Sequence, residues 1–221
     1  RYPLSEVKQT SDEAMGLTVQ KGARRWKNGV VPYVLLGGMP ESAMVHARGQ
    51  FARAGIKLIP RTKEADYLEV IMIPKTSCPD EVCNFAGFSR SLGFRKGKNS
   101  IYLVNDESFP QFIQSPNAAQ ADAWRKLGLF TLMHEIGHAI GLRHEQAHPD
   151  AKKQIAPSSS QSKFEGRGVA VTKFDFKSIM LYCLSFKPKG KPDSTPICDI
   201  RNMPTTLSKL DLSGIKKYYN K

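Results

Sequence analysis

The stretch HEIGHAIGLRH, residues 134–144, holds three of the five histidines in the chain. His134 and His138 are one helical turn apart, so their imidazoles project from the same face of a helix and can chelate one metal ion. His144 lies six residues beyond His138 and cannot continue that face. The helix must therefore end and the chain must turn back, and Gly141 stands where a left-handed residue makes such a turn at little cost.

Three neutral imidazoles and an open position that holds water form the arrangement of a catalytic zinc site. Such an ion lowers the pKa of the bound water and polarises a carbonyl group. Glu135 adjoins the first histidine, so its carboxylate can take the proton of that water and later deliver it to a leaving amine. H-E-x-x-H alone occurs by chance on amphipathic helices, but the glycine and the third histidine make the motif far more specific. We therefore predict one Zn²⁺ held by His134, His138 and His144.

A methionine-containing turn lies beneath the metal in zinc peptidases with this extended motif. Residues 178–182 follow at a suitable distance, and Met180 also fits an ordinary core position. Tyr182 is either a core aromatic residue or a phenol that reaches the metal or a developing oxyanion. His148 is expected to be a surface loop histidine and not a fourth ligand, because three ligands are already assigned. His46 is expected to be a partly exposed packing residue.

The surrounding sequence predicts an α+β fold with a mixed sheet, because strand patterns come early and helix patterns lie at both ends. Residues 85–94 are expected to form an edge strand. Residues 1–25 have weak periodicity and are expected to form an extension, and the polar residues 149–173 are expected to form a loop. The other expected strands span residues 30–36, 56–60, 67–73 and 100–105. The expected helices span 39–54, 118–141 and 209–219, and the second of these is either one long helix or two in close succession.

The chain has 221 residues, a length typical of one domain, and 40% of them are apolar. Its longest apolar stretch, residues 30–39, is interrupted by proline and glycine and falls short of the roughly 20 residues that span a bilayer. We therefore expect no membrane span. Residues 1–25 lack the apolar core of a signal peptide, so any targeting segment is expected to have been removed.

The charge is strongly basic, with 33 Lys and Arg residues against 20 Asp and Glu residues and a net charge of +13. The basic residues are spread along the chain in short clusters, and no nucleic-acid-binding motif is visible. We expect no specific nucleic-acid partner, and the charge favours non-specific attraction to acidic surfaces or polysaccharides.

The four cysteines are Cys78, Cys83, Cys183 and Cys198. An even number is compatible with two disulfides and an oxidising compartment, and four reduced thiols in a cytosolic protein are the alternative. The pairs Cys78–Cys83 and Cys183–Cys198 each bracket a loop-like segment, which favours them among the three possible pairings. Closing the longer loop is worth about 3 kcal/mol in the chain-entropy model.

These motifs resemble those of the astacin family of zinc metallopeptidases, which belongs to the metzincins. The zinc motif continues past His144 with Glu145, and a Glu there separates the astacins from other metzincins. Residues 178–182 are similar to the Met-turn of the family, including its tyrosine, and residues 26–33 are similar to the start of its first strand. The resemblance covers roughly residues 24–221.

The resemblance implies a two-lobed peptidase domain, with an N-lobe over residues 24–144, a C-lobe over residues 145–221 and an active-site cleft between the lobes. It implies a secreted endopeptidase that is made as a zymogen and cleaves proteins or peptides. The matched residues are the zinc ligands His134, His138 and His144, the general base Glu135, the Met-turn residue Met180 and the switchable fifth zinc ligand Tyr182.

Residues 1–23 form an N-terminal extension relative to this domain. In the astacins the mature amino terminus is buried near the Glu that follows the third ligand, here Glu145, and residues 1–16 make such burial awkward for Arg1. The segment either lies near the cleft as a remnant of a pro-region or packs on the surface of a mature enzyme. We favour the second arrangement and expect Glu145 to have local partners.

We expect the substrate peptide to lie antiparallel to the edge strand within residues 85–94 and to gain main-chain hydrogen bonds there. A second hypothesis is a non-catalytic zinc protein on the same scaffold that binds acidic polymers through its charge. Glu135 argues against this hypothesis, because binding alone does not need that carboxylate. The sequence indicates neither an oligomeric state nor a natural substrate.

Overall fold

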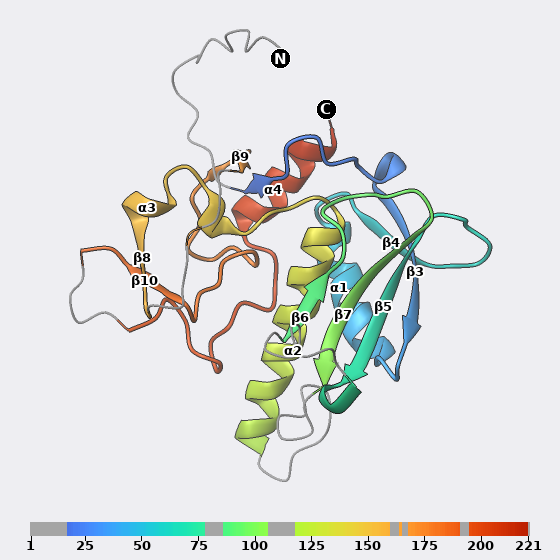
Figure 1. Ribbon diagram of the computed structural model, residues 1–221, viewed down its shortest axis with the longest axis horizontal. Coiled ribbons are helices and arrows are strands. Elements are labelled where there is room, and N and C mark those ends of the chain that lie inside the picture. Colours follow the sequence, from blue (N-terminus) through green and yellow to red (C-terminus); the bar gives the residue numbers. More distant parts are fainter. Residues whose placement is uncertain are drawn as a thin grey trace, which may run out of the picture.

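A computed structural model describes residues 17–77, 86–105, 118–159, 164, 168–190 and 195–220. Its five-stranded sheet has the order β4-β3-β5-β7-β6 (Figure 1). The pairs among β3, β4, β5 and β7 are parallel, and β6 pairs with β7 in the antiparallel sense, so the predicted mixed sheet with an edge strand is confirmed. The strands are β3 (Val30–Leu36), β4 (Lys57–Pro60), β5 (Tyr67–Pro74), β6 (Gly87–Ser89) and β7 (Lys98–Asn105).

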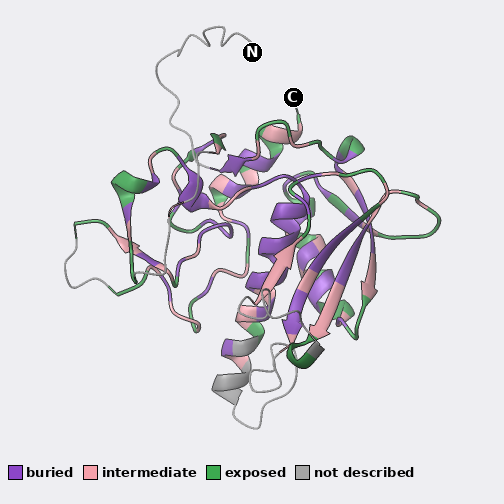
Figure 2. Ribbon diagram, viewed as in Figure 1, coloured by how far each residue is buried: buried purple, intermediate pink, exposed green. Residues whose placement is uncertain are grey.

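Two helices, α1 (Glu41–Ala52) and α2 (Ala118–Ala139), pack against the sheet and against each other. Both were expected from apolar residues at helical spacing, and both form. The main core lies between these helices and the strands, where Figure 2 shows the buried residues gathered. Completely buried members include Met44 and Phe51 of α1, Leu132, Met133 and Ile136 of α2, and Val31, Leu68, Val70, Ile101 and Leu103 of the sheet.

The C-terminal helix α4 (Lys209–Tyr219) has the predicted bounds. A capping box begins it, because the Ser208 hydroxyl accepts from the Asp211 amide and the Asp211 carboxylate accepts from the Ser208 amide. At its other end the Tyr219 hydroxyl donates to the carbonyl of Ile140 at 3.0 Å. The Tyr219 hydrogen bond joins α4 to the segment that follows α2.

The expectation of a loop over residues 149–173 is wrong in part. This region contains the short helix α3 (Ala151–Gln154), β8 (Ile155–Pro157) and β9 (Val169–Ala170). β8 pairs with β10 (Phe186–Pro188), which lies in the stretch between Cys183 and Cys198. Each of these strands is too short to show an alternating pattern in the sequence, and pairing with a distant segment creates them.

The expected extension over residues 1–23 ends in a segment that packs into the domain. Leu17 and Val19 are buried, and β2 (Thr18–Val19) pairs with β9. The Thr18 carbonyl also accepts from the amide of Arg143 at 2.7 Å. Residues 17–19 therefore brace the approach to His144, a role that their sequence does not indicate.

Three short 3-10 helices complete the described elements: η1 (Lys27–Gly29), η2 (Lys75–Ser77) and η3 (Glu145–Ala147). None of the helices in the described part of the chain combines the length and the apolar character that a membrane crossing requires. Cys78 and Cys83 lie outside the described residues, so their pairing stays a prediction.

Gly37 should be the least replaceable residue of the turn between β3 and α1. Its φ is +67°, and a Cβ there would overlap the carbonyl oxygen of Met72 on β5. Gly38 has φ +78°, but its Cβ would meet only the Met72 methyl group at 3.6 Å. Left-handed strain costs roughly 1–2 kcal/mol at either position, so Gly38→Ala should lose about that much and Gly37→Ala clearly more. Urea unfolding of both variants measures the difference, and equal losses would contradict the packing argument.

Candidate metal centre

The last turns of α2 and the following bend bring three histidines together. His134 and His138 lie on one face of α2, with ring centroids 4.8 Å apart. The helix ends at Ala139, and Gly141 adopts φ +104°, the left-handed conformation that the sequence predicts. The bend returns His144 to the helix, where its Nε2 lies 3.0 Å from Nε2 of His138.

Backbone carbonyl groups orient two of the three rings. Nδ1 of His134 lies 2.9 Å from the carbonyl oxygen of Ile179, and Nδ1 of His138 lies 2.9 Å from that of Leu142. A carbonyl oxygen only accepts, so each Nδ1 carries the proton and each Nε2 keeps its lone pair. Nε2 of His134 is buried and has no hydrogen-bond partner in the described part of the chain.

The donor set suits one zinc ion. One ligand nitrogen from each of His134, His138 and His144 lies within 4.8 Å of the others. Burial, followed by the neighbouring His138 and His144, holds the pKa of His134 well below its usual value, so this imidazole is neutral. Neutral imidazoles are preferred zinc ligands, and an ion at their centre would give the buried Nε2 of His134 a partner.

Glu135 lies beside the histidines with its carboxylate buried. Its side chain is 5% exposed, and Oε2 has no hydrogen-bond partner among the described residues. Burial raises the pKa of this carboxyl group to about 8. A Cβ at Gly87 would lie 3.2 Å from Cγ of Glu135, so the backbone of the edge strand β6 passes close to this residue.

Met180 packs against the part of α2 that carries the zinc motif. The residue is completely buried, and its carbonyl accepts from the amide of Glu145 at 2.9 Å. A Cβ at Gly137 would overlap the Met180 sulfur, so the glycine inside the zinc motif makes room for this side chain. The close contact joins the Met180 turn to α2 between the first two ligand histidines.

Asp211 anchors the same turn to α4, a role that sequence reasoning missed. Its carboxylate accepts from the Ile179 amide at 3.0 Å and from the Ser178 hydroxyl at 2.8 Å. Ile179 in turn orients His134 through its carbonyl. Burial raises the pKa of Asp211 to about 6. The capping-box pattern at Ser208 predicts only the helix start. The bonds that Asp211 accepts from Ser178 and Ile179 depend on tertiary contacts, which leave no signal in the sequence.

The ring of Tyr182 lies against the metal histidines. Its centroid is 4.3 Å from that of His144 and 5.3 Å from that of His134. The side chain is half-buried, and its amide donates to the Gln146 side chain at 3.4 Å. The ring also packs against the core, so its position is compatible with both alternatives, and the role of the hydroxyl stays a prediction.

Glu145, the residue after the third histidine, is completely buried. Its Oε1 accepts from the Asp175 amide at 2.8 Å, so the expected partners are found for one of its two oxygens. Oε2 has no partner in the described part of the chain, and burial holds the pKa of this carboxyl group well above its usual value. Arg1 and the rest of residues 1–16 lie outside the described residues.

The expectation that His148 is a surface residue is wrong. It is 4% exposed, its Nδ1 accepts from the Asp150 amide at 2.9 Å, and its ring packs edge-on against Phe174. The preceding helix η3 directs it inward. It lies outside the three-histidine group, as expected. His46 is half-buried, with Nε2 2.6 Å from the Thr205 carbonyl oxygen.

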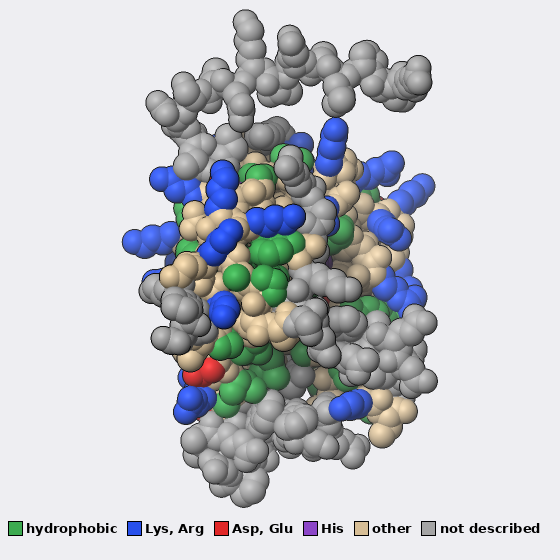
Figure 3. Space-filling model, turned by 60° about the vertical axis from the view of Figure 1, so that its left-hand side comes forward, with side chains coloured by type: hydrophobic (Ala, Val, Ile, Leu, Met, Phe, Trp, Pro, Cys, Tyr) green, Lys and Arg blue, Asp and Glu red, His purple; other side chains and the backbone are tan. Residues whose placement is uncertain are grey.

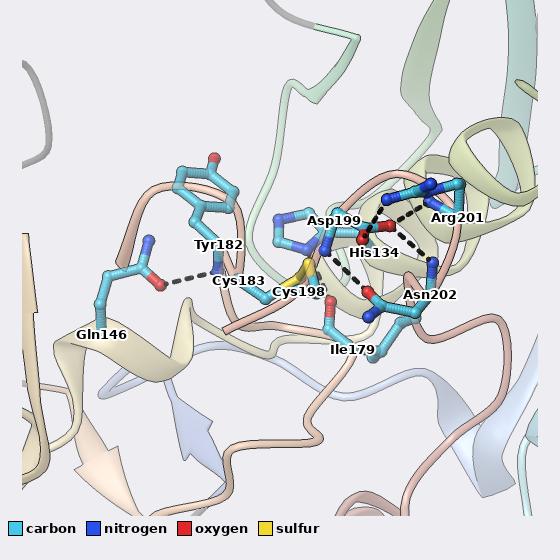
Figure 4. Close-up of a disulfide and its surroundings, with 9 residues drawn as sticks. All are labelled: His134, Gln146, Ile179, Tyr182, Cys183, Cys198, Asp199, Arg201 and Asn202. Carbon is cyan, nitrogen blue, oxygen red and sulfur yellow. Dashed lines mark hydrogen bonds and ion pairs between the residues drawn. A yellow bond between two sulfur atoms is a disulfide. The ribbon is translucent and has the colours of Figure 1, made fainter. Parts of the chain in front are cut away.

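A disulfide joins Cys183 to Cys198, as the loop pattern predicts, with their Cα atoms 5.2 Å apart. It lies next to Tyr182 (Figure 4).

No protein-family model matches the sequence. The chain is 25% identical over 218 residues to zinc metalloproteinase nas-4 of Caenorhabditis elegans, covering 89% of this chain and 59% of that protein. It is 32% identical over 95 residues to zinc metalloproteinase nas-3 of the same organism, covering 41% of this chain and 32% of that protein. The chain thus spans little more than half the length of one curated relative and about a third of the other.

Solved structures share the fold. High choriolytic enzyme 1 of Oryzias latipes, a hatching enzyme zinc-protease, matches with a TM-score of 0.56 and 22% identity, over 90% of this chain and 94% of that one. Myroilysin matches with a TM-score of 0.58 and 17% identity, over 93% of this chain and 99% of that one. The chain thus resembles zinc proteases in both sequence and fold. The resemblance inferred from Glu145 and the Met180 turn is therefore confirmed.

The chain should bind one zinc ion, and removing the ion should lower its melting temperature because binding favours the folded state. His134→Gln should abolish the site, since it removes a ligand nitrogen that has no other partner among the described residues. His148→Gln is the matched control, because that histidine is buried outside the ligand group. Metal analysis after dialysis, with calorimetric melting, measures both effects. A folded wild-type chain that takes up no zinc, or loss of zinc from the control, would contradict the assignment.

Proposed function

We propose that this chain is the catalytic domain of a zinc-dependent endopeptidase in which Glu135 is the general base. The observation that carries the proposal is the buried carboxylate of Glu135 beside three convergent imidazoles, with Oε2 unpartnered among the described residues. A site that only held zinc would not need this costly group, because burying a carboxylate without partners is unfavourable. The named relatives are zinc metalloproteinases, which agrees with the proposal.

Zinc, when bound, lowers the pKa of a water molecule and polarises the substrate carbonyl group. Oε2 of Glu135 accepts the proton of the attacking water, and the carboxyl group then delivers this proton to the nitrogen of the departing amine. The Tyr182 hydroxyl donates a hydrogen bond to the carbonyl oxygen of the substrate as negative charge develops on it. Both side chains act from positions next to the ligand histidines.

The edge strand β6 is the proposed docking site for the substrate main chain. β6 ends the sheet, and its backbone approaches Glu135 closely at Gly87. A peptide added antiparallel to this strand would gain main-chain hydrogen bonds and place a peptide bond near the carboxylate. The absence of a side chain at Gly87 permits this close packing.

Secretion and synthesis as a zymogen are part of the proposal. The disulfide Cys183–Cys198 supports an oxidising compartment. The alternative function, binding of acidic polymers without catalysis, has weaker support. Figure 3 shows Lys and Arg side chains spread over one face and not gathered in a single patch. Such a distribution favours non-specific attraction.

Glu135→Gln should abolish peptide cleavage while leaving zinc bound. The amide keeps the shape of the side chain but cannot take a proton, and loss of a general base lowers the rate by roughly 10²–10⁴-fold. Cleavage of a quenched fluorescent peptide library by the zinc-loaded chain, with and without a chelator, measures the activity. Salt-sensitive binding of acidic polymer by a wild-type chain that cleaves no peptide would favour the alternative function.

Tyr182→Phe should lower kcat with little change in KM or in zinc content. It deletes one donor aimed at the oxyanion, and such a donor is worth about 10²–10³ in kcat. Tyr33→Phe is the matched control, because it removes a tyrosine hydroxyl that donates to Glu41 and belongs to the sheet strand β3 instead of the Met180 turn. Steady-state kinetics on both variants test this role, and an unchanged kcat for Tyr182→Phe would contradict it.

A further inference from the structure

Tyr182 lies on a segment without regular secondary structure. The hydrogen bond from its amide to the Gln146 side chain is long, at 3.4 Å. Its carbonyl accepts from the amide of Ser185, three residues farther along the same segment. The Met180 turn before it is held by α4 and by Glu145. On the other side the chain leaves directly into Cys183. On this side the position of the ring depends on what holds Cys183.

The disulfide to Cys198 fixes the position of Cys183. Cys183 and Cys198 are 2% and 7% exposed, and the Cys183 carbonyl also accepts from the Cys198 amide at 3.3 Å. The two cysteines are 15 residues apart in sequence, so the bond removes most of the freedom of the intervening loop. Cys183 thus moves only with the segment that carries Cys198.

The segment after Cys198 is in turn fixed to α2, the helix that carries His134. Asp199 closes a tight turn, with its carboxylate accepting from the amides of Arg201 and Asn202. The Arg201 carbonyl accepts from the Lys126 ammonium group on α2 at 2.9 Å. Figure 4 shows this turn and Tyr182 on opposite sides of the disulfide. The disulfide, the Asp199 turn and the bond from Lys126 to Arg201 together link Tyr182 to α2, the helix that carries His134 and His138.

One side of the disulfide borders a pocket of about 610 Å³ that opens to solvent, lined in part by Cys183, Ile197, Cys198 and Asn202. On that side the segment faces the pocket and not a packed core. The covalent bond adds to the packing on the inner side, where Leu181 and Cys183 are buried.

We propose that the Cys183–Cys198 disulfide is a positioning device that holds the Tyr182 phenol over the metal histidines. This inference rests on the proposed role of Tyr182 in peptide hydrolysis. The bond acts through Tyr182 and makes no contact with the substrate. Its loss should let the ring leave the histidines while the zinc ligands, which α2 and the Gly141 bend hold directly, stay in place.

A double-mutant cycle tests the inference, with Cys183→Ser and Cys198→Ser combined in one variant so that no unpaired thiol remains at this site. In the chain with Tyr182, loss of the disulfide should lower kcat by about 10–100-fold, the effect of misplacing a group that must be oriented. In the Tyr182→Phe chain the same change should have less than about a two-fold effect, because the group that it positions is gone. Metal analysis should give one zinc in all four proteins. Equal losses in both backgrounds, or no loss in either, would overturn the proposal.

A spectroscopic measurement keeps the inference testable whatever the activity. In ring-labelled tyrosine NMR spectra, the Tyr182 signal is identified by its absence from Tyr182→Phe. The nearby His134 and His144 rings should displace this signal, and loss of the disulfide should move it to the position of a mobile tyrosine. An unchanged signal would overturn the inference. An inactive wild-type chain, or equal kcat for wild type and Tyr182→Phe, would instead count against the proposed function.

Discussion

Three imidazole nitrogens converge on one point because the chain reverses direction at Gly141. A straight helix would carry His144 away from the face that presents His134 and His138, so the left-handed residue decides whether a third ligand exists. The bend has support on both sides. The amide of Gly141 donates to the carbonyl of His138, and residues 17–19 pair with the chain that leaves the bend. The N-terminal strand and the metal centre are therefore parts of one structural unit.

The residues of the site are all held, directly or through other residues, by helix α2. It carries His134, Glu135 and His138 directly, and the other parts reach it through intermediates. Asp211 holds Ile179, whose carbonyl fixes the ring of His134, so the start of α4 and a metal ligand are joined by two hydrogen bonds. Such an arrangement reduces the freedom of each ligand before a metal binds, which lowers the entropic cost of binding.

One buried carboxyl group lies within the zinc motif, and another directly follows it. Glu135 and Glu145 each keep one oxygen without a partner in the described part of the chain. Asp211 and Asp175 are also buried, but hydrogen bonds satisfy them and they organise the Met180 turn and α4. A buried polar group without a partner is costly, so its presence points to a role outside the stability of the fold. These two carboxyl groups belong to residues that the sequence motif also singled out.

The sequence by itself determined the features that depend on neighbours along the chain. The spacing of His134 and His138, the turn at Gly141 and the helical periodicity of α1, α2 and α4 are local properties, and all were predictable. Tertiary structure decided the rest, because contacts between distant segments leave no periodic signal in either segment. The pairing of β8 with β10, the burial of His148 and of residues 17–19, and the second use of Asp211 all arise in this way. Each depends on a partner that only folding brings near.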